Sequence, residues 1–184
     1  MSYKIDFKDL DILLFSGRGL ISHITKLCTW SKWSHIGMIL IEDKPLIWEC
    51  QKLNNIPDHY TGKCKNGLQK VPMWDRIKEY DGEVWHRRLL IERDEKFYSR
   101  LNIVKNTKFK SNQFCSNFFK LLNATLPVHI NIGESRGLFC SELVANIYQR
   151  MLLLDIKTSY KKYSPADFDF GKAGYLFGPL ERIK

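Results

Sequence analysis

A cysteine with chemically suited surroundings stands near the C-terminal third of this sequence. From residue 139 to 152, apolar residues recur at three- and four-residue spacing, which predicts a helix with one buried face: Phe139, Leu143, Val144, Ile147, Tyr148, Met151 and Leu152. Cys140 lies at the start of this helix, after a polar stretch with two glycines that predicts a surface loop. Unpaired backbone N–H groups and the helix dipole favour a thiolate there. An inert, packed cysteine is the alternative, and position alone leaves both open.

A histidine far upstream has a carboxylate in a matching position. Residues 34–41 and 45–50 each predict a mostly buried strand, with Glu-Asp-Lys between them as a hairpin turn. Because side chains alternate along a strand, His35 and Glu49 then share one face of the hairpin. They are diagonal neighbours, or directly opposite in a tighter turn, roughly 5 to 8 Å apart at Cβ.

These three residue types together suit nucleophilic catalysis. A carboxylate at Glu49 can hold one imidazole nitrogen of His35, while the other nitrogen faces the thiol of Cys140. Each residue also has a plainer interpretation. His35 alone can be a strand histidine with ordinary partners, and Glu49 a carboxylate at an edge or facing solvent, although its apolar neighbours disfavour full exposure.

Four short segments resemble the circularly permuted branch of the NlpC-type papain-like superfamily. They are DILLF at 11–15, WSHIGM at 33–38, FCSELVA at 139–145 and YSPADF at 163–168, in order along most of the chain. The histidine precedes the cysteine, as in the permuted branch, which includes the YiiX-like bacterial proteins and their poxvirus relatives. Lecithin:retinol acyltransferase has a comparable order.

The resemblance implies a fold and a role for each residue. The fold would be α+β, with an antiparallel sheet and helices packed beside it, formed by a single domain over residues 1–184. Cys140 would be the nucleophile, His35 the base and Glu49 the third polar residue. The assignment of Glu49 rests on strand placement rather than on a distinctive motif.

The chemistry that follows is thiol-dependent acyl transfer. A thiolate attacks a carbonyl, N–H groups at the helix start receive the oxyanion, and a thioacyl intermediate passes to water or another acceptor. We therefore expect a cysteine hydrolase or acyltransferase acting on an ester or amide, with an acylated or lipid substrate favoured. A peptidase or amidase on a peptide is the runner-up. A noncatalytic papain-like binding module and a basic nucleic-acid-binding protein remain as other classes.

Composition is typical of an enzyme-sized domain in a reducing compartment. The chain has 184 residues, of which 44% are hydrophobic, and five cysteines without a CxxC pair. No apolar run approaches the roughly 18 residues of a membrane helix, and the first residues lack a hydrophobic signal region. These features predict a cytoplasmic protein. The sequence predicts neither a cofactor nor a metal site.

The formal net charge of +9 points to an anionic partner. Lysines cluster at 105, 108 and 110 and again at 161 and 162, and such a surface attracts phosphate in nucleic acid or on a membrane. A solvated lysine-rich face is the alternative. Because no nucleic-acid-binding motif accompanies the charge, we expect at most peripheral contact with an anionic membrane, through lysines rather than through an inserted helix.

The remaining elements follow from periodicity and turn residues. Residues 20–28 predict a helix ending near Trp30. We expect its apolar face to join the core rather than to anchor a membrane, because the opposite side carries only Arg18, Ser22, His23 and Lys26. Residues 52–70 predict a long polar loop. Other predicted strands are 11–15, 71–73, 82–90 and 175–180, and other predicted helices are 74–80, 93–104 and 113–122; Cys115 in the last is expected to be packed rather than reactive.

Overall fold

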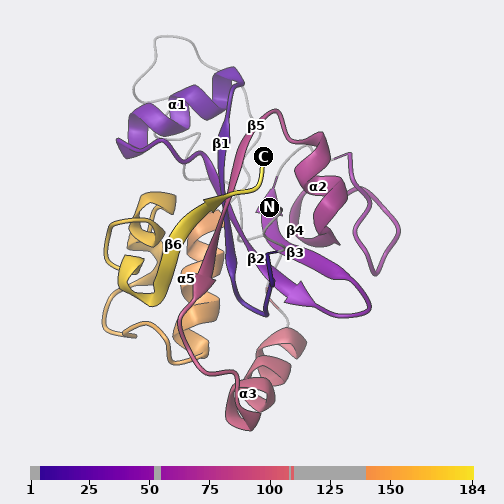
Figure 1. The fold of residues 1–184 in the computed structure, drawn as a ribbon, viewed down its shortest axis with the longest axis vertical. Helices are drawn as coiled ribbons and strands as arrows, with labels where there is room; N and C mark the ends of the chain where they lie inside the picture. Colours follow the sequence, from indigo (N-terminus) through magenta and orange to yellow (C-terminus); the bar gives the residue numbers. More distant parts are fainter. Residues whose placement is uncertain (1–4, 52–54, 108, 110–139) are drawn as a thin grey trace.

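The computed structural model describes residues 5–51, 55–107, 109 and 140–184, and shows an α+β fold (Figure 1). Within these residues six antiparallel strands form one sheet in the order β4-β3-β2-β1-β5-β6. The strands are β1 (Ile12–Gly17), β2 (His35–Ile41), β3 (Pro45–Gln51), β4 (Gly67–Pro72), β5 (Gly82–Leu89) and β6 (Phe177–Arg182). The predicted antiparallel sheet with helices beside it is therefore confirmed at the level of an α+β fold.

Four α-helices lie among the described residues, and three short 3-10 turns follow between the last helix and β6. The helices are α1 (Leu20–Thr29), α2 (Met73–Glu79), α3 (Glu95–Asn106) and α5 (Cys140–Arg150), and the turns are η2 (Tyr160–Lys162), η3 (Pro165–Phe168) and η4 (Gly174–Leu176). In Figure 1, α1 lies beyond the end of β1, and α3 lies at the opposite end of the molecule. Among the described residues, no helix has both the length and the apolar character needed to cross a bilayer.

The two faces of the sheet bury different helices because side chains alternate along each strand. One cluster joins even-numbered residues of β1 and β2, such as Leu14 and Met38, to α5 and α3. The other joins odd-numbered residues, such as Phe15 and Ile39, to α2. Both faces are covered, which explains why β1, β2 and β3 are almost continuously apolar.

Among the described residues, the apolar stripe of α5 is buried as predicted except at Leu152; Phe139, also predicted for the stripe, lies outside the described residues. Leu143, Val144, Ile147 and Tyr148 are fully buried. Leu152, which the periodicity placed on the same face, is 66% exposed. The helix ends at Arg150, and Leu152 adopts a left-handed backbone with φ of 59°, so its side chain leaves the stripe.

Two other expectations were wrong. The helix at 20–29 forms, but Leu20 and Leu27 on its apolar face are 76% and 75% exposed rather than in the core. The side chains of the other residues of that face, Ile21, Ile24 and Cys28, are not described. The loop expected over 52–70 ends earlier than predicted, because residues 67–70 belong to β4 and pair with β3. The predicted helix at 113–122 with Cys115, as well as Lys108 and Lys110, lies outside the described residues.

Candidate active site

His35 and Glu49 lie on the same face of the β2–β3 hairpin, as predicted. The register pairs Met38 with Trp48, so that His35 and Glu49 are diagonal neighbours rather than directly opposite. The His35 Nε2 atom is 2.5 Å from Glu49 Oε2. Gly37, two residues after His35 on β2, faces Glu49 on β3, and a Cβ there would lie 2.6 Å from Ile47 Cγ2 and 3.3 Å from Glu49 Cβ. A glycine at 37 therefore leaves room for the close contact.

Cys140 reaches the same histidine from a different element. It is the first residue of α5 and is half-buried. The Cys140 side chain hydrogen-bonds His35 and acts on it electrostatically. Because Glu49 occupies Nε2, the Nδ1 atom is the ring nitrogen available to the thiol. The three predicted residues thus come together, Cys140 from a helix start and the other two from the sheet.

The first turn of α5 is held in place by the segment at 163–168. The buried Ser141 hydroxyl donates a hydrogen bond of 2.7 Å to the Tyr163 carbonyl. That segment is itself fixed by a capping box, in which Ser164 and Asp167 exchange hydrogen bonds around η3. Since the first N–H groups of a helix have no acceptor inside it, the N–H groups at this end of α5 can receive a developing oxyanion.

Two further residues, which sequence reasoning missed, hold Glu49 in place. Glu49 has no exposed surface, and its Oε1 atom accepts hydrogen bonds from Arg76 Nε at 2.9 Å and Gln69 Nε2 at 3.2 Å. Arg76 comes from α2 and also lies over the rings of Phe15 and Tyr80. A buried carboxylate without a charged partner would take up a proton. The contact with Arg76 allows Glu49 to stay ionised in the interior.

The charges of the site favour an imidazolium next to the thiol. Burial lowers the pKa of His35, but the charges of Cys140 and Glu49 and the hydrogen bonds to both outweigh this effect and raise it from 6.5 to about 9. Burial also raises the pKa of Glu49, whereas Arg76 and His35 lower it more strongly, to about 2. At neutral pH the site therefore holds a protonated His35 between two groups that favour its charge.

A second cluster contains a buried carboxylate between a histidine and an arginine but has no cysteine. Asp11, which is fully buried, contacts His86 Nε2 at 3.0 Å and Arg93 at 2.6 Å. The other nitrogen of His86 lies 3.5 Å from the carboxylate of Glu181. The cysteine distinguishes the site at His35 from this structural counterpart.

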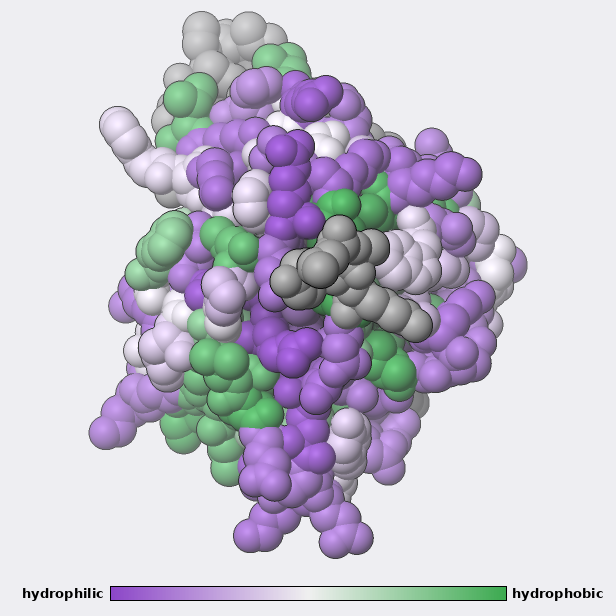
Figure 2. All heavy atoms as spheres, viewed as in Figure 1, coloured by the Kyte–Doolittle hydropathy of each residue, from purple (hydrophilic) through white to green (hydrophobic). Residues whose placement is uncertain are grey.

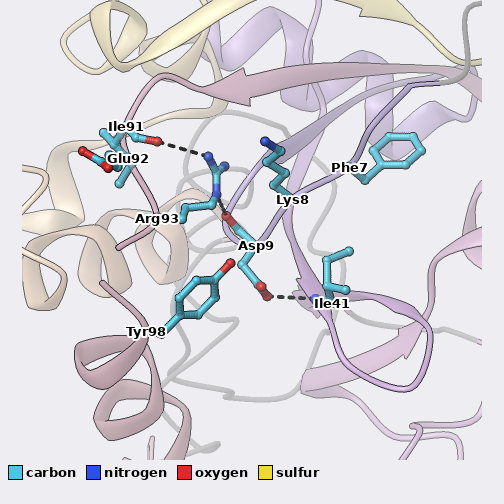
Figure 3. Close-up of a pocket in the computed structure, with 8 residues that line it drawn as sticks. All are labelled: Phe7, Lys8, Asp9, Ile41, Ile91, Glu92, Arg93 and Tyr98. Carbon is cyan, nitrogen blue, oxygen red and sulfur yellow. Dashed lines mark hydrogen bonds between the residues drawn. The ribbon is translucent and has the colours of Figure 1, made fainter. Parts of the chain in front are cut away.

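A hollow of about 500 Å³ lies at the far end of the sheet from His35, beside Asp9 and Arg93 (Figure 3). The Asp9 carboxylate accepts a hydrogen bond from the Ile41 N–H at 2.8 Å, and Arg93 donates to the carbonyls of Asp9 and Ile91. Asp9 and Arg93 thus bind neighbouring backbone, and Arg93 also contacts the carboxylate of Asp11. The lining contains no cysteine or histidine, so we place the candidate site at Cys140 and not here.

Comparison with protein families finds none that matches, and comparison with curated proteins finds no similar sequence. Among solved structures, the metalloprotein YiiX from Escherichia coli O157:H7 superposes with a TM-score of 0.50, over 96% of each chain and at 15% identity. The chain is similar in fold to YiiX. At this identity the likeness bears on fold alone. In the part of this chain that the structure describes, no three His, Cys, Asp or Glu side chains gather as metal ligands.

Proposed function

We propose that this protein is a cysteine-dependent hydrolase or acyltransferase of ester or amide bonds, with a permuted papain-like arrangement of Cys140, His35 and Glu49. The observation that carries the proposal is the interaction of Cys140, at a helix start, with a histidine whose other nitrogen is held by a buried carboxylate. The fold similarity to YiiX agrees with it.

The mechanism follows from where the protons lie. The Cys140 thiolate attacks the carbonyl carbon and forms a C–S bond, while N–H groups at the start of α5 stabilise the oxyanion. Protonated His35 then gives its proton to the leaving alcohol or amine as the C–O or C–N bond breaks. In the second half, neutral His35 takes a proton from water or another acceptor, which attacks the thioacyl carbon and releases Cys140.

Glu49 acts on the base rather than on the substrate. Its carboxylate orients the ring of His35 and favours the imidazolium that the first step requires. Arg76 in turn keeps Glu49 ionised. A peptidase or amidase would use the same groups, and we place an acyl ester or amide first because the chain is basic and a lipid surface is anionic.

Cysteine labelling with a panel of electrophilic probes tests the proposal. Cys64 is the matched control in the same chain. It is exposed, and its thiol donates a hydrogen bond to the backbone carbonyl of Asn55. Near neutral pH, Cys140 is expected to react faster than Cys64 even though it is less exposed. His35→Ala should slow the labelling of Cys140 and leave Cys64 unchanged. Equal rates at the two cysteines would overturn the proposal.

A further inference from the structure

Two apolar side chains of α1, those of Leu20 and Leu27, are exposed at the end of the sheet that carries the candidate site. Leu20 and Leu27 are separated by seven residues, two helical turns, and therefore share one face of the helix. They are 76% and 75% exposed, and Trp30, directly after the helix, is 96% exposed. In the region that α1 occupies at the upper left of Figure 1, Figure 2 shows hydrophobic residues at the surface beside hydrophilic ones.

The charged side chains of α1 and of the residues flanking it in the chain have one sign. Residues 17–34 contain no Asp or Glu but include Arg18, Lys26 and Lys32. Lys26 donates a hydrogen bond of 2.7 Å to the Gly17 carbonyl, which is a neutral group. No carboxylate within residues 17–34 balances its positive charge. Lys32 lies over the rings of Trp33 and Trp85, so its charge is held beside the end of α1.

We propose that α1, together with Trp30, docks the protein onto the surface of an anionic lipid membrane. Exposed leucines and a tryptophan with basic flanks are the composition of a helix that lies in the membrane interface. Ten residues are too few to span a bilayer, so the helix lies along its surface. A second copy of the chain is disfavoured as the occupant, because it would bring two segments of like charge face to face.

The start of α1 also adjoins the candidate site. A Cβ on Gly17 would lie 2.3 Å from Ser22 Oγ in α1 and 2.7 Å from the Tyr80 hydroxyl. Tyr80 is 3.1 Å from the hydroxyl of Ser34, the residue before His35. A membrane bound by α1 therefore lies next to the reactive end of the sheet. If Cys140 is the nucleophile of the proposed function, on which this step rests, the placement favours an acyl-lipid ester or amide as the substrate.

Vesicle flotation tests the docking without depending on catalysis. The full chain carrying Cys140→Ala is mixed with phosphatidylcholine vesicles, with or without phosphatidylserine, at several salt concentrations. We expect binding to the anionic vesicles only, weakening with salt, and falling roughly tenfold or more in Leu27→Ser/Trp30→Ser. Ile103→Ser is the matched control, since Ile103 is 68% exposed in α3 at the opposite end of the molecule, and its binding should be unchanged.

Tryptophan fluorescence with brominated lipids gives a second readout on the unaltered surface. Quenching should occur on anionic vesicles and should fall in Trp30→Phe but not in the matched variant Trp74→Phe, because Trp74 is also exposed, at 54%, but lies in α2. Binding that does not change in Leu27→Ser/Trp30→Ser would overturn the proposal, as would equal binding to neutral vesicles. A concentration-dependent dimer abolished by the same variant, without vesicle binding, would instead identify a second copy as the occupant.

The two proposals fail separately. Hydrolysis of a short, water-soluble ester by the unmodified chain reports on Cys140 and not on α1. Retained ester hydrolysis with no vesicle binding would overturn the membrane proposal alone, and vesicle binding without any ester turnover would overturn the proposed function alone.

Discussion

Replacing Glu49 by glutamine removes one charge from the site while preserving the size of the side chain. In the native chain the carboxylate contacts His35 Nε2 at 2.5 Å and Arg76 Nε at 2.9 Å. The amide oxygen of a glutamine can still accept a hydrogen bond, but it no longer favours a positive charge on the ring. Loss of a close opposite charge moves a pKa by about 1 to 3 units, so the pKa of His35 should fall from about 9 toward 6.5.

The same change has a cost in stability that needs its own control. Arg76 is 4% exposed, and removing its charged partner should lower the free energy of unfolding by about 3 to 5 kcal/mol. Asp11→Asn is the matched control, because Asp11 is equally buried and contacts both an arginine and a histidine. It should cost a comparable amount of stability without altering the pKa of His35.

Nitrogen NMR titration of the histidine rings measures the pKa directly, and the pH dependence of Cys140 alkylation reports its consequence. In Glu49→Gln, the alkylation profile should shift together with the His35 titration. Our account of Glu49 is refuted if His35 titrates as in the unaltered chain, or if Asp11→Asn moves the titration by as much.

Three further outcomes are expected. Gly37→Ala should lower the free energy of unfolding, measured by urea denaturation, by about 2 kcal/mol, because the added Cβ would lie 2.6 Å from Ile47 Cγ2. Gly19→Ala is the control: no atom lies within 4 Å of its Cβ, so the free energy of unfolding should fall by less than about 1 kcal/mol. Ser141→Ala should cost about 1 to 3 kcal/mol and slow Cys140 alkylation, since it leaves the Tyr163 carbonyl without this hydrogen bond; an unchanged rate would show that Ser141 does not position the thiol. Finally, His35 has a folded pKa above its ordinary 6.5, so its contribution to stability is complete below about pH 6.5 and disappears as the pH rises through about 9. kcat/KM should fall over the same upper limb as the imidazolium is lost, and a flat profile up to pH 10, about one unit above that pKa, would contradict the assignment of His35 as the proton donor.

Local periodicity was enough to predict, in outline, how the candidate site residues are placed. The helical stripe after Cys140 predicted a helix start, and the alternation of the two strands placed His35 and Glu49 on one face. Whether His35 and Glu49 are diagonal or directly opposite depends on the register of the hairpin. The three residues of the turn, 42–44, do not determine that register from sequence. Arg76 and Gln69 could not be found in this way, because they reach Glu49 only through the pairing of β4 with β3 and the packing of α2.

The helix at 20–29 shows a different limit of sequence reasoning. Its spacing correctly predicted a helix with one apolar face. An amphipathic pattern does not say what covers that face. We assigned it to the core rather than to a membrane because the opposite side carries only Arg18, Ser22, His23 and Lys26. Leu20 and Leu27 are exposed because other helices already cover the sheet, α2 on one face and α3 and α5 on the other. This depends on tertiary packing, which local spacing does not report.

Trapping the covalent intermediate tests the central claim most directly. The chain is mixed briefly with an activated acyl ester, quenched in acid, and analysed by intact-protein and peptide mass spectrometry. We predict one acyl group on Cys140 that hydroxylamine removes, that does not form in Cys140→Ala, and that forms much more slowly in His35→Ala. Acylation of Cys64 at a similar rate, or acylation of Cys140 at the same rate without His35, would contradict a Cys140–His35 catalytic pair.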